Sequence, residues 1–365
     1  MKKRSQLGKL YGTAVCLALA MLLPLCGCAW RLDRAPESDG PVPASTREGE
    51  LAAEVDRPET DDRSAASDRA KPFAYAFDPH VISKAYIRVY GEEIEPLFYS
   101  FCDAVLAGRD SFPCPSAERL HRLLEIARVC LPVAAFCIRA DDVSVKDGVG
   151  YLSYSMDRDE LLRTVKAFQS KVTGVISGSI PCREEDFIMA AELLRTVAHK
   201  DIAAEEDLVS FDNALSVMPY RAIMEDKGIC QEIAGEYIYY LLQIGIDATT
   251  CSALSSDQEY AHMWAIAELD GAYYHIDPMF TIEYPDSLAF FCLNDDMRSQ
   301  YGDFPIENFT YAESDAFAAG DFAADSERFK PLWRAESYQI DRENRVLRLK
   351  LFDLYAQERY DEFSY

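Results

Sequence analysis

The chain has 365 residues, of which 49% are hydrophobic and 12% aromatic, so it is long enough for two domains and can bury a sizeable core. It carries 37 Lys and Arg against 62 Asp and Glu, a formal net charge of −25. Such a surface repels nucleic acid and anionic membranes at long range, so we expect no nucleic-acid partner.

The first residues have the layout of a secretory signal. Residues 1–9 are basic, residues 10–25 form an apolar run, and the first acidic residue is Asp33. The run is shorter than a typical membrane span, as in the hydrophobic region of a signal peptide.

The apolar run ends in Leu25-Cys26-Gly27-Cys28, which resembles the lipobox of bacterial lipoproteins. The resemblance implies cleavage of a signal peptide over residues 1–27 and lipidation of Cys28. The protein would then lie outside the cytoplasm, anchored to the cell membrane by its N-terminal lipid. The alternative is an uncleaved N-terminal membrane helix, which also places the rest of the chain outside the cytoplasm.

The next segment, residues 28–75, is rich in Pro, Ala, Asp, Glu and Arg and has no persistent hydrophobic period. Because this composition cannot repay its ordering entropy, we predict a disordered tether. Apolar residues become denser after it, and we expect an N-terminal helical or mixed domain over residues 76–182. Its boundary is indicated by Gly178 and Pro181.

Hydrophobic spacing predicts several elements outside the central region. They are helices over Glu118–Val133, from Asp157 or Asp159 onward and over Glu184–His199, a hairpin over Val143–Tyr154 around Asp147-Gly148, and a strand through Leu347, Leu349 and Leu351. The strand belongs to a C-terminal extension, residues 311–365.

Seven cysteines remain when the signal region and Cys230, discussed next, are set aside. They are widely spaced, and no Cys-x-x-Cys pair occurs, so a zinc site is not supported and no metal is expected. We interpret them as buried apolar cysteines, with room for one disulfide. They are Cys102, Cys114, Cys130, Cys137, Cys182, Cys251 and Cys292.

Cys230 lies where a helix is predicted to begin. Apolar residues recur at spacings of three and four from Ile233 to Leu242, and Gly245 stops the pattern, which predicts an amphipathic helix. Gly228 is expected to provide the tight turn before it. A helix N-terminus favours thiolate, the form that attacks carbonyls. A buried core cysteine is the alternative for Cys230 taken alone.

A hairpin is predicted over Ala261–Leu269 and Ala272–Pro278, which flank Asp270-Gly271. A two-residue turn makes paired residue numbers sum to 541, which places His262 and Asp277 diagonally on one face, within about 7–8 Å. An imidazole oriented by a carboxylate is what an activated thiol requires. The same register leaves His275 as a rival base.

Several motifs in this region resemble the transglutaminase-like superfamily, which is related to papain. They are Tyr220 ten residues before Cys230, the turn Gly228–Gln231, the strand pattern His262–Trp264, and the strand Tyr274–Pro278 with its Asp-Pro end. The stretch Phe290–Leu293 and the following Asp295–Met297 also resemble that family's downstream strand and helix start. The resemblance covers about residues 183–310.

The resemblance implies an α+β fold with a papain/transglutaminase-like core, in which a helix bearing the cysteine packs on an antiparallel sheet, and an N-terminal α/β support region. It implies Cys230 as nucleophile, His262 as base and Asp277 as its orienting group. Tyr220, Gln231 and Trp264 are implied as oxyanion or supporting residues.

The chain departs from the family pattern at three positions beside these motifs. They are Arg221 after the tyrosine, Glu232 after Gln231, and Met279 after the Asp-Pro pair. The departures bear on substrate access and on the shape of the oxyanion site.

Two hypotheses follow. The first is a thiol-dependent acyl-transfer enzyme without cofactor, acting on peptide or protein amides as a peptidase or a transglutaminase, with cell-envelope proteins among its candidate substrates. The second is a non-catalytic transglutaminase-like module that binds a partner at the cell surface.

Overall fold

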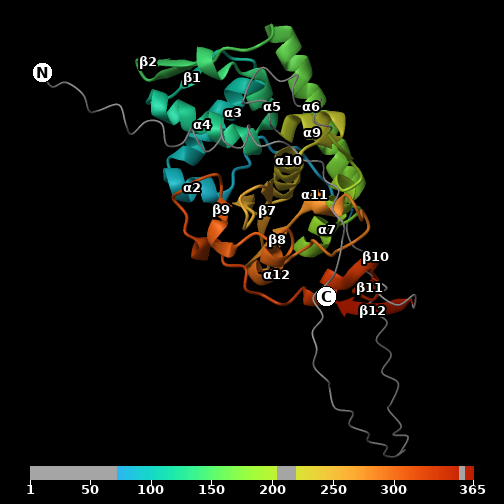
Figure 1. Ribbon diagram of the computed structural model, residues 1–365. Helices are drawn as coiled ribbons and strands as arrows, with labels where there is room; N and C mark the ends of the chain where they lie inside the picture. The colour runs from blue at the N-terminus through green and yellow to red at the C-terminus, as the bar shows by residue number, and fades with distance from the viewer. Residues whose placement is uncertain (1–71, 204–218, 353–357) are drawn as a thin grey trace, which may run out of the picture. The chain divides into compact units, whose positions relative to one another are not determined.

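The computed structural model describes residues 72–203, 219–352 and 358–365, which belong to a compact unit spanning Ala70–Tyr365 (Figure 1). The predicted signal peptide, the lipidation site at Cys28 and most of the predicted tether lie outside the described residues. Within the described part of the chain, no helix is long and apolar enough to cross a membrane.

The predicted tether ends earlier than residue 75. Pro72 already forms a β-bridge with Cys182, and the Phe73 amide donates to the Pro181 carbonyl at 3.3 Å. Tyr75 follows with a hydrogen bond from its hydroxyl to Gln243. These residues are paired because their aromatic rings and backbone groups find partners on the folded unit, which composition alone did not reveal.

The first part of the unit contains both helices and strands. Its helices are α2 (Lys84–Tyr90), α3 (Ile94–Leu106), α4 (Ala117–Cys130), α5 (Pro132–Cys137) and α6 (Arg158–Ser179), with the short 3₁₀ helix η1 (Ala140–Asp142). Its strands are β1 (Ser111–Pro113), β2 (Ser144–Lys146) and β3 (Val149–Tyr151), in the antiparallel order β1-β3-β2.

Two of the local predictions here can be compared with the structure. The hairpin is confirmed: β2 and β3 are joined by Asp147 and Gly148, both at positive φ (52° and 76°), as a two-residue turn of this type requires. The single helix predicted over Glu118–Val133 is wrong. The chain breaks at Leu131, and Pro132 begins a new helix, because proline cannot donate the hydrogen bond that a continuous helix needs.

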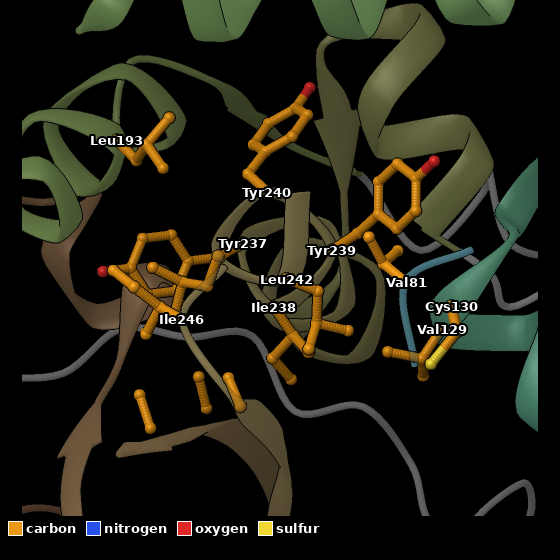
Figure 2. Close-up of a cluster of buried hydrophobic side chains, with 14 of the residues drawn as sticks. Val81, Val129, Cys130, Leu193, Tyr237, Ile238, Tyr239, Tyr240, Leu242 and Ile246 are labelled. Atoms are coloured by element: carbon orange, nitrogen blue, oxygen red, sulfur yellow. The ribbon is translucent and has the colours of Figure 1, made fainter. Parts of the chain in front are cut away.

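A central helix, α10 (Cys230–Gln243), carries most of the packing. It contacts α4, α7 (Asp186–Val197) and α9 (Pro219–Glu225) as well as the main sheet. Figure 2 shows side chains of α10 directed outward on several sides, among them Tyr237, Ile238 and Tyr240. The helix is therefore buried all round rather than amphipathic, and its polar residues lie inside the protein.

The main sheet is antiparallel, with strand order β8-β7-β6-β9. Its strands are β6 (Ala248–Leu254), β7 (Ala261–Leu269), β8 (Ala272–Ile276) and β9 (Thr310–Tyr311). The predicted hairpin register is confirmed: Ala265 pairs with Ile276 and Leu269 with Ala272. This register places His262 and Asp277 at the same end of the hairpin, away from the turn.

The remaining elements surround this sheet. A short parallel pair, β4 (Asp201–Ile202) and β5 (Lys227–Gly228), leads into α10, and α11 (Pro278–Thr281) follows β8. Then come α12 (Asp295–Gln300), η3 (Ile306–Asn308), η4 (Ala319–Phe322), η5 (Lys330–Arg334), and the antiparallel sheet β10 (Ala335–Asp341), β11 (Val346–Leu351) and β12 (Arg359–Ser364). The strand predicted through Leu347–Leu351 is confirmed as β11.

The hydrophobic core is continuous across the predicted domain boundaries. One cluster of buried residues runs from Val81 to Leu351, and α7 contacts both α6 and α10. The predicted divisions at residues 182 and 310 therefore do not separate independent cores. The described unit is a mixed helical and antiparallel fold built around α10 and the main sheet.

Candidate active site

Cys230 is the first residue of α10 and its side chain is half-buried. Gly228 precedes it, and a Cβ there would lie 3.1 Å from Glu232 Cβ and 3.3 Å from Ala222 Cβ. Glycine is therefore needed for the close approach of α9 to the start of α10, not for an unusual backbone angle. The thiol is thus held at the positive end of a long, fixed helix.

The start of α10 is held in place by an ion pair between Arg221 and Glu232. Arg221 on α9 donates from Nε to Glu232 Oε1 at 2.8 Å and from Nη2 to Oε2. Glu232 Oε2 also accepts from the Ile229 amide at 2.9 Å. Arg221 and Glu232 are both buried, so their charges compensate each other and stabilise the turn that presents Cys230.

His262 and Asp277 are in direct contact. The distance from His262 Nε2 to Asp277 Oδ2 is 2.7 Å, and both side chains are fully buried. Because Asp277 occupies Nε2, the other ring nitrogen, Nδ1, is the one left for a nucleophile. Cys230 contributes to the raised pKa of His262, and the Tyr260 hydroxyl lies 3.4 Å from Nδ1.

The charges of this cluster favour an imidazolium. Burial alone would lower the pKa of His262, but the charge and hydrogen bond of Asp277, together with Cys230, outweigh it and raise the pKa to about 9. Burial would likewise raise the pKa of Asp277, but His262, Arg298 and the Phe280 amide lower it below its ordinary value. The pair is therefore held as imidazolium and carboxylate near neutral pH.

Both carboxylate oxygens of Asp277 are held by hydrogen bonds. Oδ1 caps α11 by accepting from the Phe280 amide at 3.1 Å, and Pro278 occupies the first position of that helix. Oδ2 accepts from His262 and from Arg298 Nη2, the latter at 3.0 Å. The carboxylate cannot rotate without losing several of these bonds at once.

Aromatic rings surround the imidazole. Phe280 stacks on His262 with 4.6 Å between ring centroids and 14° between planes, and Phe304 and Trp264 each lie at 5.8 Å. These rings exclude water from the His262–Asp277 bond. Charge interactions in such an environment are stronger than in solvent.

His275, the rival base, is committed elsewhere. Its Nδ1 accepts from Trp264 Nε1 at 2.8 Å, and its Nε2 lies 2.8 Å from Asp295 Oδ1. Burial lowers the pKa of His275 despite the Asp295 contact. With both ring nitrogens engaged by other groups, His275 supports the sheet and His262 is the histidine beside Cys230.

The predicted supporting residues have different places. Trp264 bridges the two histidines, as described above. Tyr220 on α9 stacks on Phe136 with 4.0 Å between centroids, and among the described residues it makes no hydrogen bond to the triad. Gln231 lies at the second position of α10 and lines a small pocket together with Met263 and Thr250.

Several residues of the site gave no usable signal in the sequence. Arg298, Phe280 and Phe304 come from three segments that follow the hairpin and converge on it. The predicted downstream strand over Phe290–Leu293 is reduced to one β-bridge between His275 and Leu293, because Cys292 adopts a positive φ of 54° and interrupts the extended chain. The helix predicted at Asp295 is present as α12.

The other thiols contrast with Cys230. All seven predicted structural cysteines are free and buried, whereas Cys230 is half-buried. Burial raises the pKa of Cys130 and Cys137, each to about 12, and also raises the pKa of Cys251 and Cys292 well above the ordinary value. Within the described residues, no cluster of three or more His, Cys, Asp and Glu side chains could hold a metal ion.

Comparisons with known proteins give little further guidance. No protein-family model and no curated protein sequence matches the chain. Among solved structures, a "TGase" crystal structure aligns with 12% identity and a TM-score of 0.27, over 41% of this chain and 47% of that one. A "Putative Cysteine Protease from Cytophaga hutchinsonii" aligns with 14% identity and a TM-score of 0.24, over 31% of this chain and 36% of that one. The chain thus spans about half the length of the first and about a third of the second.

Proposed function

We propose that the chain is a thiol-dependent acyl-transfer enzyme, with a papain/transglutaminase-like core, that acts on peptide or protein amides. The observation that carries the proposal is the 2.7 Å contact between the buried side chains of His262 and Asp277. Cys230, at the start of α10, adds to the rise in the pKa of His262. A nucleophile, a base and a group that orients the base are the three parts that covalent acyl transfer requires.

The first half of the reaction forms an acyl-enzyme. The Cys230 thiolate attacks the amide carbonyl, and the negative charge that develops on the carbonyl oxygen is stabilised at the N-terminus of α10. The His262 imidazolium gives its proton to the leaving amine as the C–N bond breaks. Asp277 keeps the ring oriented and compensates its charge until the proton leaves.

The second half returns the enzyme to its starting state. A water molecule or a primary amine attacks the thioester, and neutral His262 takes the proton of the attacking group. The thiolate leaves, and the thiolate–imidazolium pair is restored. Water as acceptor makes the protein a peptidase or amidase, and an amine makes it a transglutaminase.

The proposal includes the setting in which the enzyme works. The basic start, the apolar run and the motif ending in Cys28 support export and attachment to the membrane through an N-terminal lipid. The substrate would then be an extracytoplasmic protein or peptide, with cell-envelope proteins as the first candidates. The acidic surface makes nucleic acid an unsuitable partner.

A covalent probe tests the proposed reaction. A short peptide amide bearing an electrophilic carbon should form one adduct on Cys230, found by mass spectrometry, and His262→Ala should slow the adduct by on the order of tenfold or more. Incorporation of a fluorescent primary amine into casein whose own lysines are blocked would identify the amine route. Cleavage of a peptide without such incorporation would identify hydrolysis. Absence of any adduct on Cys230, with His262→Ala indistinguishable from wild type, would favour the surface-binding module instead.

A further inference from the structure

Arg298 is the most unusual group near the triad. It is fully buried, and its guanidinium carbon lies 3.8 Å from the centroid of the Trp264 ring. A buried arginine is costly to place in a protein unless its charge and its donors are matched. The groups that contact the guanidinium therefore indicate the role of its positive charge.

The guanidinium has two directed hydrogen bonds. Nη2 donates to Asp277 Oδ2 at 3.0 Å, and Nη1 donates to the Tyr301 carbonyl at 2.6 Å. The first reaches the same carboxylate oxygen that lies 2.7 Å from His262 Nε2. One oxygen of Asp277 is thus held between the imidazole and the guanidinium, while Trp264 fixes the plane of the guanidinium from one side.

We propose that Arg298 is a positioning residue of the triad, which keeps Asp277 ionised and aimed at His262. This inference rests on the proposed function, because it assigns Arg298 to the same Cys230–His262–Asp277 site. Arg298 does not touch the reacting atoms. It acts through Asp277 and so widens the pH range in which the imidazolium and the thiolate can coexist.

Among the described residues, the neighbouring titratable groups do not supply the permanent positive charge that Arg298 places beside Asp277. Tyr260 and Cys251 also interact with it, but both are neutral or weakly acidic groups near neutral pH. His275 and Asp295 form their own pair, and Trp264 donates to the other ring nitrogen of His275. Arg298 is thus the permanent cation that directly contacts Asp277 among the described residues.

The consequence has a definite sign. A cation beside Asp277 lowers the pKa of that carboxyl, so removing the cation raises it. In a variant without the cation, Asp277 therefore takes up its proton at a higher pH than in wild type. Its bond to His262 weakens at that higher pH, and the thiolate–imidazolium pair is lost there as well. Lysine at position 298 preserves the charge, whereas methionine preserves only the bulk over Trp264.

The test compares Arg298→Met with Arg298→Lys in the full-length protein. The first readout is the NMR resonance of the His262 Nε2 proton, followed during acidification. We expect Arg298→Met to lose this resonance about one pH unit higher than wild type, and Arg298→Lys to remain within a few tenths of a unit of wild type. If Arg298→Met does not fold, Arg298→Gln serves as the neutral variant.

A matched control is available at Arg328, which pairs with Asp270 and lies over the Phe329 ring at 4.8 Å, away from the triad. Arg328→Met should leave the His262 resonance unchanged. The second readout is the pH at which alkylation of Cys230 by iodoacetamide reaches half its maximal rate, which should rise by about one unit in Arg298→Met only.

Two results would overturn the inference: a resonance in Arg298→Met that persists to the same pH as in wild type, or a lysine variant that behaves like the methionine variant. The first result would mean that Arg298 only fills space, and the second would mean that its positive charge is not what holds Asp277. If wild-type Cys230 proves unreactive, the proposed function fails, but the NMR comparison still decides the role of Arg298.

Discussion

His262 and His275 show how two similar residues acquire opposite properties. Both are buried, and each contacts an aspartate at 2.7–2.8 Å. Trp264 donates a hydrogen bond to Nδ1 of His275, which can accept it only while that nitrogen carries no proton. His262 has no such donor from Trp264, so the charge of Asp277 raises its pKa whereas burial lowers that of His275.

Arg221 and Glu232 show the same dependence on partners. Each alone looks like a departure that would disturb the nucleophile's turn. Together they form a buried ion pair, and Glu232 also receives the Ile229 amide. Breaking such a pair by removing one partner leaves an uncompensated buried charge, which is far more costly than replacing both.

At the scale of elements, α10 matters because it is buried on every side and still carries acidic residues. Glu236 is fully buried, and Lys200 Nζ lies 3.0 Å from its Oε1, an ion contact without good hydrogen-bond geometry. The same lysine donates to the Ala222 carbonyl at 2.9 Å and to Asp226 at 2.7 Å. Lys200 thereby links α9, the loop before β5 and the middle of α10.

Glu236 should make stability depend on pH. Burial raises its pKa to about 7, although Lys200 opposes the shift. The folded state therefore holds more protons than the unfolded state between the ordinary glutamate pKa and about pH 7. The free energy of unfolding should fall as pH rises through that window, by up to about 3 kcal/mol.

Glu236→Gln should remove most of this fall, since glutamine does not titrate. Urea unfolding of wild type and variant at pH 5 and pH 7.5 measures the difference, with exposed Glu225→Gln as the matched control. An equal pH dependence in wild type and Glu236→Gln would show that Glu236 does not carry the effect.

The sequence predicts the hairpin of β7 and β8 well because its information is local. Asp270-Gly271 dictates a two-residue turn, and the turn dictates the register that brings His262 near Asp277. The helix bearing Cys230 follows equally from spacing and from Gly245. The prediction fails where remote segments decide: Arg298 reaches Asp277 across 21 residues, and no local pattern marks that contact.

The same difference between local and remote information applies to the chain as a whole. The mixed fold is expected from the resemblance of the motifs around Cys230, His262 and Asp277, but the single core could not be predicted, since buried residues from Val81 to Leu351 join it. The break between α4 and α5 is a smaller example, because the apolar spacing predicts a continuous helix through Pro132.

The proposed membrane attachment is tested on the whole molecule. Cys28→Ala should abolish metabolic fatty-acid labelling and release or mislocalise the protein, because the thioether to the lipid needs that thiol. Labelling that persists in Cys28→Ala would contradict the lipobox interpretation. Cys16→Ala, in the same apolar region, is the control expected to remain labelled.

The central claim is that Cys230 is activated by His262 and Asp277. Its most direct test is the rate of iodoacetamide alkylation at each cysteine of the folded protein near neutral pH, measured by mass spectrometry. Cys230 should react at least on the order of tenfold faster than the seven buried thiols. His262→Ala should slow that reaction, and Asp277→Ala should slow it less, since Asp277 only orients the ring and stabilises its charge. Rates at Cys230 that match those of the buried thiols and do not change in His262→Ala would contradict the account.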